Sequence, residues 1–140
     1  MRLKGKVSII TGAASGIGKA TAEKFVKEGA IVAVCDLNID AVNAVVEELK
    51  ALGGEAVGYL VNVTDKAQIA DMVGDLKNRF GRIDVLVNNA GIVMDAQLIK
   101  MTDDQFDKVI DINLKGVYNC ARAVVDTMVE QGGGVILNAS

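Results

Sequence analysis

A chain of 140 residues predicts a single domain, and because 51% of its residues are apolar it can bury one sizeable core. The net charge of −3, without a run of basic residues, argues against nucleic acid or anionic membranes as partners. No apolar stretch is long enough for a membrane span, and no signal peptide is recognisable. Histidine is absent, and Cys35 and Cys120 lack metal-ligand or disulfide spacing. We therefore expect a cytoplasmic protein with free thiols and no metal site.

The first predicted strand, Lys6 to Thr11, contains an almost continuous apolar run, which is typical of a strand buried on both faces of a parallel sheet. Gly12-Ala13-Ala14-Ser15-Gly16-Ile17-Gly18 follows, and then an amphipathic helix expected over about 15–28. Glycines let the backbone turn sharply and approach a ligand, and the N-terminus of a helix attracts a diphosphate. The spacing is G-x-x-x-G-x-G and not G-x-G-x-x-G, so the turn alone does not separate a phosphate site from a plain strand-to-helix turn.

The second predicted strand, over 31–35, ends at Asp36, a little over twenty residues beyond Gly12. A dinucleotide-binding unit places an acid there to accept hydrogen bonds from the adenosine ribose hydroxyls. A carboxylate repels a 2′-phosphate, and no Arg or Lys stands at positions 13–15, so the sequence favours NAD, with NADP as the alternative cofactor. Asp36 could instead cap the next helix, but Asn38 is better placed for that role.

Helix and strand patterns alternate through the rest of the chain. Helices are expected over 41–52 and 69–80, with strands over 56–61 and 83–87. The last of these strands runs into Asn88-Asn89-Ala90-Gly91, which fits either a ligand-lining loop whose amides brace its neighbours or an ordinary Asn-Gly turn. Thr102 and Gln105 have capping-box spacing at the start of a long helix, whose apolar stripe over 106–128 includes Asn113. A glycine triplet at 132–134 separates this helix from a fifth strand at 135–137.

This alternation, with short loops, predicts an α/β fold with a parallel sheet and helices on both faces. With a dinucleotide turn after the first strand, we expect a Rossmann-type doubly wound sheet of five strands in order 3-2-1-4-5, in one domain over residues 1–140. The ligand crevice should then lie at the switch between strands one and four.

Four motifs, in this order along the whole chain, resemble the short-chain dehydrogenase/reductase family. They are Thr11-Gly12-Ala13-Ala14-Ser15-Gly16-Ile17-Gly18, Asn88-Asn89-Ala90-Gly91, Asn113 in Ile112-Asn113-Leu114-Lys115-Gly116, and Val135-Ile136-Leu137-Asn138-Ala139-Ser140. Within the family the chain looks most like the N-terminal portion of 3-oxoacyl-[acyl-carrier-protein] reductases. The resemblance implies NAD(P)-dependent reduction of a 3-oxoacyl thioester to the 3-hydroxyacyl thioester, in fatty acid biosynthesis. The acyl-carrier protein would be a partner of the parent enzyme only.

The resemblance also implies a role for individual residues. The residues implied to hold the diphosphate are Gly12, Ser15, Gly16, Ile17 and Gly18. The adenosine ribose would lie on Asp36 and Leu37, the adenine beside Asn62 and Val63, and the rest of the cofactor along Asn89, Ala90 and Gly91. Asn62 stands where the family commonly has Asp. Asn113 would hold a water of the proton relay, and Ser140 would be the catalytic serine or its immediate neighbour.

The family's catalytic Tyr-x-x-x-Lys motif is absent from this sequence. Tyr118 and Arg122 have the same spacing, but Arg lacks the tunable pKa of Lys, so we interpret Tyr118 as packing on a helix face. We therefore expect the cofactor-binding part of an oxidoreductase, inactive by itself. The alternatives are a nucleotide-binding module without chemistry and a self-associating half-domain. Because the fifth strand would be an apolar edge and the last helix would lack neighbours, we expect a homodimer or larger oligomer.

Overall fold

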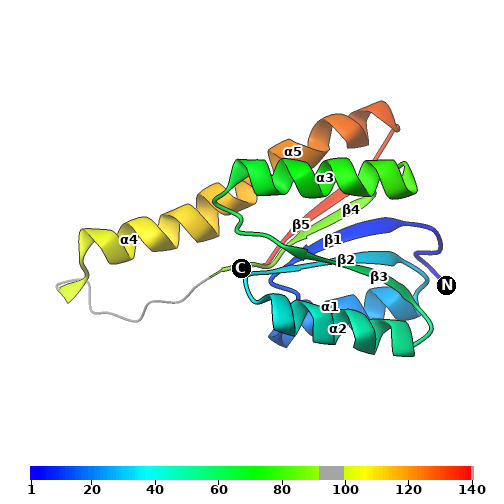
Figure 1. Ribbon diagram of the computed structural model, residues 1–140. Helices are drawn as coiled ribbons and strands as arrows, with labels where there is room; N and C mark the ends of the chain where they lie inside the picture. The colour runs from blue at the N-terminus through cyan, green and yellow to red at the C-terminus, as the bar shows by residue number, and fades with distance from the viewer. Residues whose placement is uncertain (92–99, 140) are drawn as a thin grey trace.

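The computed structural model describes residues 1–91 and 100–139. Its elements are β1 (Val7–Thr11), α1 (Gly16–Lys27), β2 (Ile31–Asp36), α2 (Ile39–Ala51), β3 (Glu55–Leu60), α3 (Lys66–Phe80), β4 (Val85–Asn88), α4 (Asp103–Ile110), the π-helical turn η2 (Asp111–Lys115), α5 (Gly116–Glu130) and β5 (Val135–Asn138). The five strands form one parallel sheet in the order β3-β2-β1-β4-β5, which confirms the predicted topology. Helices α1 and α2 cover one face, and α3 and α5 cover the other (Figure 1). Within the described ranges, no helix is long and apolar enough to cross a membrane.

Two hydrophobic cores, one on each face of the sheet, hold these three layers together. On one face Ile10 packs in a cluster with Leu49 of α2, and on the other Ile9 packs in a cluster with Leu76 of α3 and Val124 of α5. Successive side chains of a strand point to opposite faces, so the neighbours Ile9 and Ile10 serve different cores. Every residue of β1 is buried, as expected of a strand covered on both faces.

The predicted helix starts are supported by their capping hydrogen bonds. Asn38 Oδ1 accepts a hydrogen bond of 3.1 Å from Ala41 N at the start of α2. The side chains of Thr102 and Gln105 form the predicted capping box at the start of α4. These caps satisfy N–H groups that have no partner within the helix, and they fix where each helix begins.

The long helix predicted after Thr102 is divided by η2, and its apolar stripe faces the core only in the second half. All of α4 is described and none of its residues is buried; Phe106 is 54% exposed, and Leu114 of η2 is 62% exposed. Figure 1 shows the reason, because α4 projects beyond the edge of the sheet. Burial begins with α5, whose buried residues are Gly116, Cys120, Val124, Thr127 and Met128.

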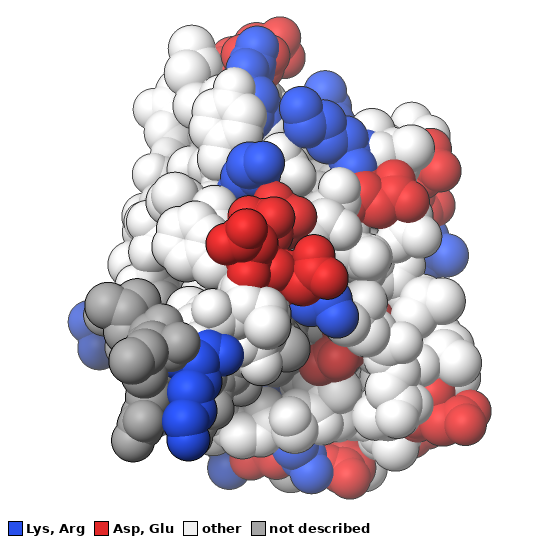
Figure 2. All heavy atoms as spheres, turned by 90° about the vertical axis from the view of Figure 1, so that its left-hand side faces the viewer, with Lys and Arg blue, Asp and Glu red and all other residues white. Residues whose placement is uncertain are grey.

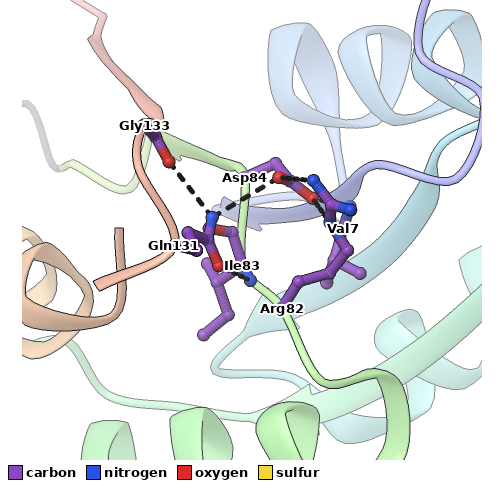
Figure 3. Close-up of polar contacts among 6 residues, drawn as sticks. All are labelled: Val7, Arg82, Ile83, Asp84, Gln131 and Gly133. Atoms are coloured by element: carbon purple, nitrogen blue, oxygen red, sulfur yellow. Dashed lines mark hydrogen bonds and ion pairs between the residues drawn. The ribbon is translucent and has the colours of Figure 1, made fainter. Parts of the chain in front are cut away.

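A polar cluster around Asp84 joins β1, β4 and the end of α5 at the amino edge of the sheet (Figure 3). The Asp84 carboxylate accepts hydrogen bonds from Val7 N at 2.9 Å and from Arg82 Nε and Nη2, both at 2.7 Å. Gln131 donates to the carbonyl of Ile83 and accepts from its N–H at 3.3 Å. Burial of the carboxylate raises its pKa, but the hydrogen bonds and charge of Arg82 and the Val7 N–H outweigh burial. The pKa of Asp84 therefore lies below its ordinary value of 3.8.

Candidate cofactor site

A cavity of about 280 Å³ opens at the carboxyl edge of the sheet, beside the ends of the neighbouring strands β1 and β4. Its walls come from the ends of four strands and from η2. The lining residues are Thr11, Gly12, Ser15, Cys35, Asp36, Leu37, Val61, Asn62, Val63, Asn89, Ala90, Gly91 and Ile112. Figure 2 views this side of the molecule, and charged side chains of both signs are scattered over it without a continuous basic patch. The described residues also hold no group of His, Cys, Asp or Glu that could bind a metal ion.

The turn between β1 and α1 is shaped so that only glycine fits at three positions. Gly12 and Gly16 have φ angles of +63° and +56°, which side-chain-bearing residues rarely adopt. A Cβ at Gly18 would lie 2.2 Å from the carbonyl oxygen of Gly12 and 2.6 Å from Nδ2 of Asn89. The first turn of α1 can therefore pack directly on the loops that line the cavity.

The N-terminus of α1 is open to a ligand. Ser15 is the N-cap residue of α1, but its side chain makes no capping hydrogen bond, and Ile17 in the first turn is 75% exposed. Gly16, Ile17 and Gly18 do not themselves line the cavity. Unpaired N–H groups and the positive end of the helix dipole suit this end of α1 to a diphosphate.

Thr11 braces the loops after β1 and β4, a role that the sequence analysis did not assign to it. Its Oγ1 accepts hydrogen bonds from Asn89 N at 3.0 Å and Ala90 N at 2.9 Å, and donates to the carbonyl of Val87 at 3.4 Å. Asn89 Nδ2 in turn donates to the carbonyl of Gly12 at 3.2 Å. The Asn-Asn-Ala-Gly run is therefore a cross-braced loop and not an ordinary turn. The available signal was that Thr11 ends a buried strand with a hydroxyl.

The Asp36 carboxylate joins the glycine turn to the end of β2. Its Oδ2 accepts a hydrogen bond from Ala14 N at 3.0 Å, and its Oδ1 accepts one from Leu37 N at 2.7 Å. The alternative role for Asp36, as the cap of α2, belongs to Asn38 instead. An ionised carboxylate has about four lone-pair sites, so two remain for further donors such as ribose hydroxyls.

Asn113 lies in the π-helical turn, next to the loop after β4. Its side chain is exposed, and a Cβ added to Gly91 would lie 3.0 Å from Asn113 Oδ1. Ile112, the preceding residue, lines the cavity. The structure thus brings the predicted relay residue close to the cavity, and π-helical turns are frequent at functional sites. Ser140 lies outside the described residues.

Both tyrosines lie in the described part of the chain, and neither lines the cavity. Tyr118 is 61% exposed, and Arg122 pairs with Asp126 at 3.0 Å, so the interpretation of Tyr118 as a packed residue is wrong. The Tyr59 hydroxyl donates to the carboxylate of Asp75. Burial, followed by this hydrogen bond, raises the pKa of Tyr59, which makes it a weaker proton donor at neutral pH.

The two cysteines are free and buried, as predicted for their thiols. Burial raises the pKa of Cys120 to about 11, and it raises the pKa of Cys35 still further above the ordinary value. Because the thiolate is the reactive form, neither cysteine is suited to act as a nucleophile at neutral pH.

A doubly wound parallel sheet with a glycine turn after β1, an acid after β2 and a cavity at the switch point defines a Rossmann-type dinucleotide-binding domain. The sequence model of the short chain dehydrogenase family matches residues 6–140. The chain therefore belongs to the short-chain dehydrogenase/reductase family, whose members are NAD(P)-dependent oxidoreductases.

Individual relatives cover the chain from end to end. It is 49% identical over 140 residues to the 3-oxoacyl-[acyl-carrier-protein] reductase FabG of Thermotoga maritima, and covers 57% of that protein. It is 41% identical over 142 residues to the 3alpha-hydroxysteroid dehydrogenase of Mediterraneibacter gnavus, again covering 57%. The crystal structure of a short-chain dehydrogenase/reductase from Burkholderia xenovorans matches 98% of this chain with a TM-score of 0.94 at 35% identity, and the match covers 56% of that protein. The chain thus spans little more than half the length of these relatives, and corresponds to their N-terminal portion.

Proposed function

We propose that this chain is the cofactor-binding part of an oxidoreductase and that it prefers NAD to NADP. The observation that carries the proposal is the convergence of three groups on one cavity: the glycine turn, the Asp36 carboxylate and the cross-braced loop after β4. The open N-terminus of α1 would hold the diphosphate, Asp36 the adenosine ribose, and Asn62 and Val63 the base. The nicotinamide supplies hydride transfer when the cofactor is bound.

The preference for NAD rests on the charge at the ribose position. The Asp36 carboxylate is held in place by the N–H groups of Ala14 and Leu37. A 2′-phosphate would lie against this carboxylate, and no Arg or Lys stands among the described residues that line the cavity. We expect NADH to bind at least tenfold more tightly than NADPH when each is titrated by nicotinamide fluorescence. Asp36→Ser should narrow that difference, and tighter binding of NADPH to the unaltered chain would contradict the preference.

We further propose that the parent enzyme reduces a 3-oxoacyl thioester, which is supported by the 49% identity to the reductase of Thermotoga maritima. The chain is also 41% identical to a hydroxysteroid dehydrogenase, so the experiment must distinguish thioester from steroid substrates. The parent enzyme should reduce acetoacetyl thioesters with a higher kcat/KM than 3-ketosteroids, and the reverse order would overturn this proposal.

For the 140-residue chain alone we propose cofactor binding without turnover. The sequence has no Tyr-x-x-x-Lys, and its two tyrosines lie away from the cavity. A general acid must lie within hydrogen-bond reach of the carbonyl that it protonates. A steady-state assay with NADH and an acetoacetyl thioester should therefore show no oxidation above background. Clear turnover would contradict the proposal, and failure to bind either cofactor would favour a module with another role.

Self-association is a second proposed property, and it is supported by exposed apolar surface. Phe106, Leu114 and Tyr118 are each more than half exposed along the α4–α5 helix, and Val135 and Leu137 on the edge strand β5 are both 49% exposed. The upper left flank of the molecule in Figure 2 is nearly free of charged side chains. We propose that a second copy of the chain covers this surface, because edge strands and large apolar patches favour association. Light scattering should report a dimer or larger species, and a monodisperse monomer at high concentration would contradict it.

A further inference from the structure

The loop between β3 and α3, residues 61–65, forms one wall of the carboxyl-edge cavity but contains no helix or strand. Val61, Asn62 and Val63 all line the cavity. The position of this wall therefore depends on the hydrogen bonds and packing contacts that hold the loop in place.

The strand side of the loop is connected to Asp36. Val61 N donates to the carbonyl of Asp36 at 3.1 Å, and the Asp36 carboxylate accepts from Ala14 N in the glycine turn at 3.0 Å. The loop after β3, the end of β2 and the glycine turn are thus joined by hydrogen bonds along the carboxyl edge of the sheet. A displacement of the loop would therefore disturb the groups that we propose hold the ribose and the diphosphate.

The other side of the loop is held by Asn119 of α5. Asn119 Nδ2 donates to the carbonyl of Val63 at 3.1 Å, and no backbone N–H in the described part of the chain bonds to that carbonyl. Val63 is buried, and a buried carbonyl without a partner is costly. Because a carbonyl can only accept, the Asn119 amide must present its nitrogen to it.

Helix α5 can approach the loop closely because residue 116 is glycine. Gly116 is buried, and a Cβ added to it would lie 2.5 Å from Val63 Cγ2. Gly116 and Asn119 are three positions apart, so they lie on the same face of the helix. One face of α5 therefore fixes Val63 in two ways, by close packing and by a hydrogen bond.

We infer that Asn119 is a positioning residue of the cofactor site, which holds the loop after β3 in the conformation that the dinucleotide meets. This inference rests on the proposed dinucleotide function. Asn119 does not itself line the cavity, so it acts on the cofactor only through Val63. A wall that is already in place needs no ordering when a ligand binds, whereas the ordering of a loose wall weakens binding.

The test removes the donor with Asn119→Leu, which keeps the approximate shape of the side chain. We expect the Kd for NADH, measured by nicotinamide fluorescence, to rise about fivefold, as for the loss of one hydrogen bond. Amide hydrogen exchange in residues 61–65 should also become faster in the free variant. Asn119→Ser, whose hydroxyl is too short to reach as the amide does, carries the same expectations and keeps the test available if the leucine variant does not fold.

Gln131→Leu provides the matched control at the other edge of the sheet. The Gln131 side-chain amide also donates to a backbone carbonyl, that of Ile83, from the end of α5. Its loss should lower the free energy of unfolding, measured by urea denaturation, as the loss at Asn119 does. The Kd for NADH should stay within about twofold of that of the unaltered chain, and hydrogen exchange in residues 61–65 should not change.

Two results would overturn the inference alone. One is a rise in Kd of less than about twofold, or unchanged hydrogen exchange of the loop, in a folded Asn119 variant. The other is an equal loss of NADH affinity in Gln131→Leu, because that would show that the effect follows stability and not the position of the loop. If NADH does not bind to the unaltered chain, the proposed function fails and the inference fails with it.

Discussion

The two edges of one sheet use their polar groups in opposite ways. At the amino edge, Asp84 accepts hydrogen bonds from Arg82, Gln131 and Val7 N of β1, and Gln131 also donates to the Ile83 carbonyl, so these groups bond mainly within the protein. At the carboxyl edge, Asp36 and Asn62 keep lone pairs or N–H groups that face a cavity. The amino edge stabilises the fold, and the carboxyl edge is available for a ligand.

Cavity size alone does not distinguish the two edges of the sheet. A second groove lies at the amino edge beside Arg82, Asp84 and Gln131, and it is similar in size to the cavity at the carboxyl edge. The chemistry of the walls distinguishes them, because Arg82 and Asp84 in the amino-edge groove already pair with each other. The lesson is that free hydrogen-bonding capacity at strand ends and at a helix N-terminus marks a binding site better than volume does.

The largest expected effect comes from disrupting the close contact between the glycine turn and the first turn of α1. Gly18→Ala places a Cβ 2.2 Å from the carbonyl oxygen of Gly12, so the helix start must move away from the cavity. We expect NADH affinity to fall about a hundredfold, or about 2.7 kcal/mol, and the free energy of unfolding to fall by about 3 kcal/mol. Nicotinamide fluorescence and urea denaturation measure the two effects. Unchanged NADH binding would show that the turn does not hold the diphosphate.

Asp84→Ala tests the other edge, and should separate stability from binding. Arg82 and the Val7 N–H lose a charged partner in this variant, while the cavity at the carboxyl edge is untouched. We expect the free energy of unfolding to fall by about 2–3 kcal/mol, with the Kd for NADH unchanged within about twofold. Urea denaturation and NADH titration on the same protein provide both values. A large loss of NADH affinity in a folded variant would show that the two edges are not independent.

The contribution of Asp84 to stability at the amino edge should depend on pH in a definite direction. Because the pKa of Asp84 is lowered in the folded protein, its contribution to stability is fully present above the unfolded value of 3.8 and is lost as the pH falls through the folded value. The stability difference between the unaltered chain and Asp84→Ala should therefore be constant over roughly pH 5 to 8. It should shrink below pH 3.8. A difference that grows on acidification would contradict the lowered pKa.

A smaller effect is expected at the brace between β1 and β4. Thr11→Val keeps the shape of the side chain but removes the oxygen that accepts from Asn89 N and Ala90 N. Loss of this acceptor loosens the loop after β4, and we expect about a tenfold loss of NADH affinity, or about 1.4 kcal/mol. Thr21→Val is the matched control, because the Thr21 hydroxyl bonds only within α1, to Ile17 O. An equal loss of NADH affinity in the two variants would contradict the proposal that Thr11 braces the cofactor loops.

Gly74→Ala is expected to have the smallest effect and to act in the opposite direction. Gly74 lies in α3 with nothing within 4 Å of an added Cβ, so alanine fits and reduces the entropy of the unfolded chain. The free energy of unfolding should rise by about 0.5–1 kcal/mol, with NADH binding unchanged. Measured beside Gly18→Ala, this variant shows whether the loss at Gly18 comes from the close contact or from replacing a helical glycine. A lower free energy of unfolding in Gly74→Ala would contradict the explanation of the Gly18→Ala loss by the close contact alone.

The sequence predicts the layers of this fold well, because each element has a local signal. The buried run of β1, the cap at Asn38 and the capping box at Thr102 are all patterns within a few neighbouring residues. The sequence misses what depends on distant partners. Gln131 meets Asp84 across 47 positions, and Thr11 meets Asn89 across 78. No local pattern records such contacts.

The long helix after Thr102 shows the same limit in another form. Its apolar stripe predicts burial along its whole length, but α4 runs past the edge of the sheet, and none of its residues is buried against the described part of the chain. The π-helical turn at η2 is likewise absent from the sequence pattern, and it is the turn that carries Asn113. Amphipathic periodicity predicts a helix and its apolar face, and what covers that face depends on the rest of the fold.

A crystal structure of the chain grown with NADH is the most direct test of the central claim, that the carboxyl-edge cavity holds a dinucleotide. We expect the diphosphate at the first turn of α1, over Gly12 and Gly16, and the adenosine ribose within hydrogen-bond distance of the Asp36 carboxylate. NADH in the amino-edge groove beside Asp84, or crystals in which the carboxyl-edge cavity excludes NADH at saturating concentration, would contradict it.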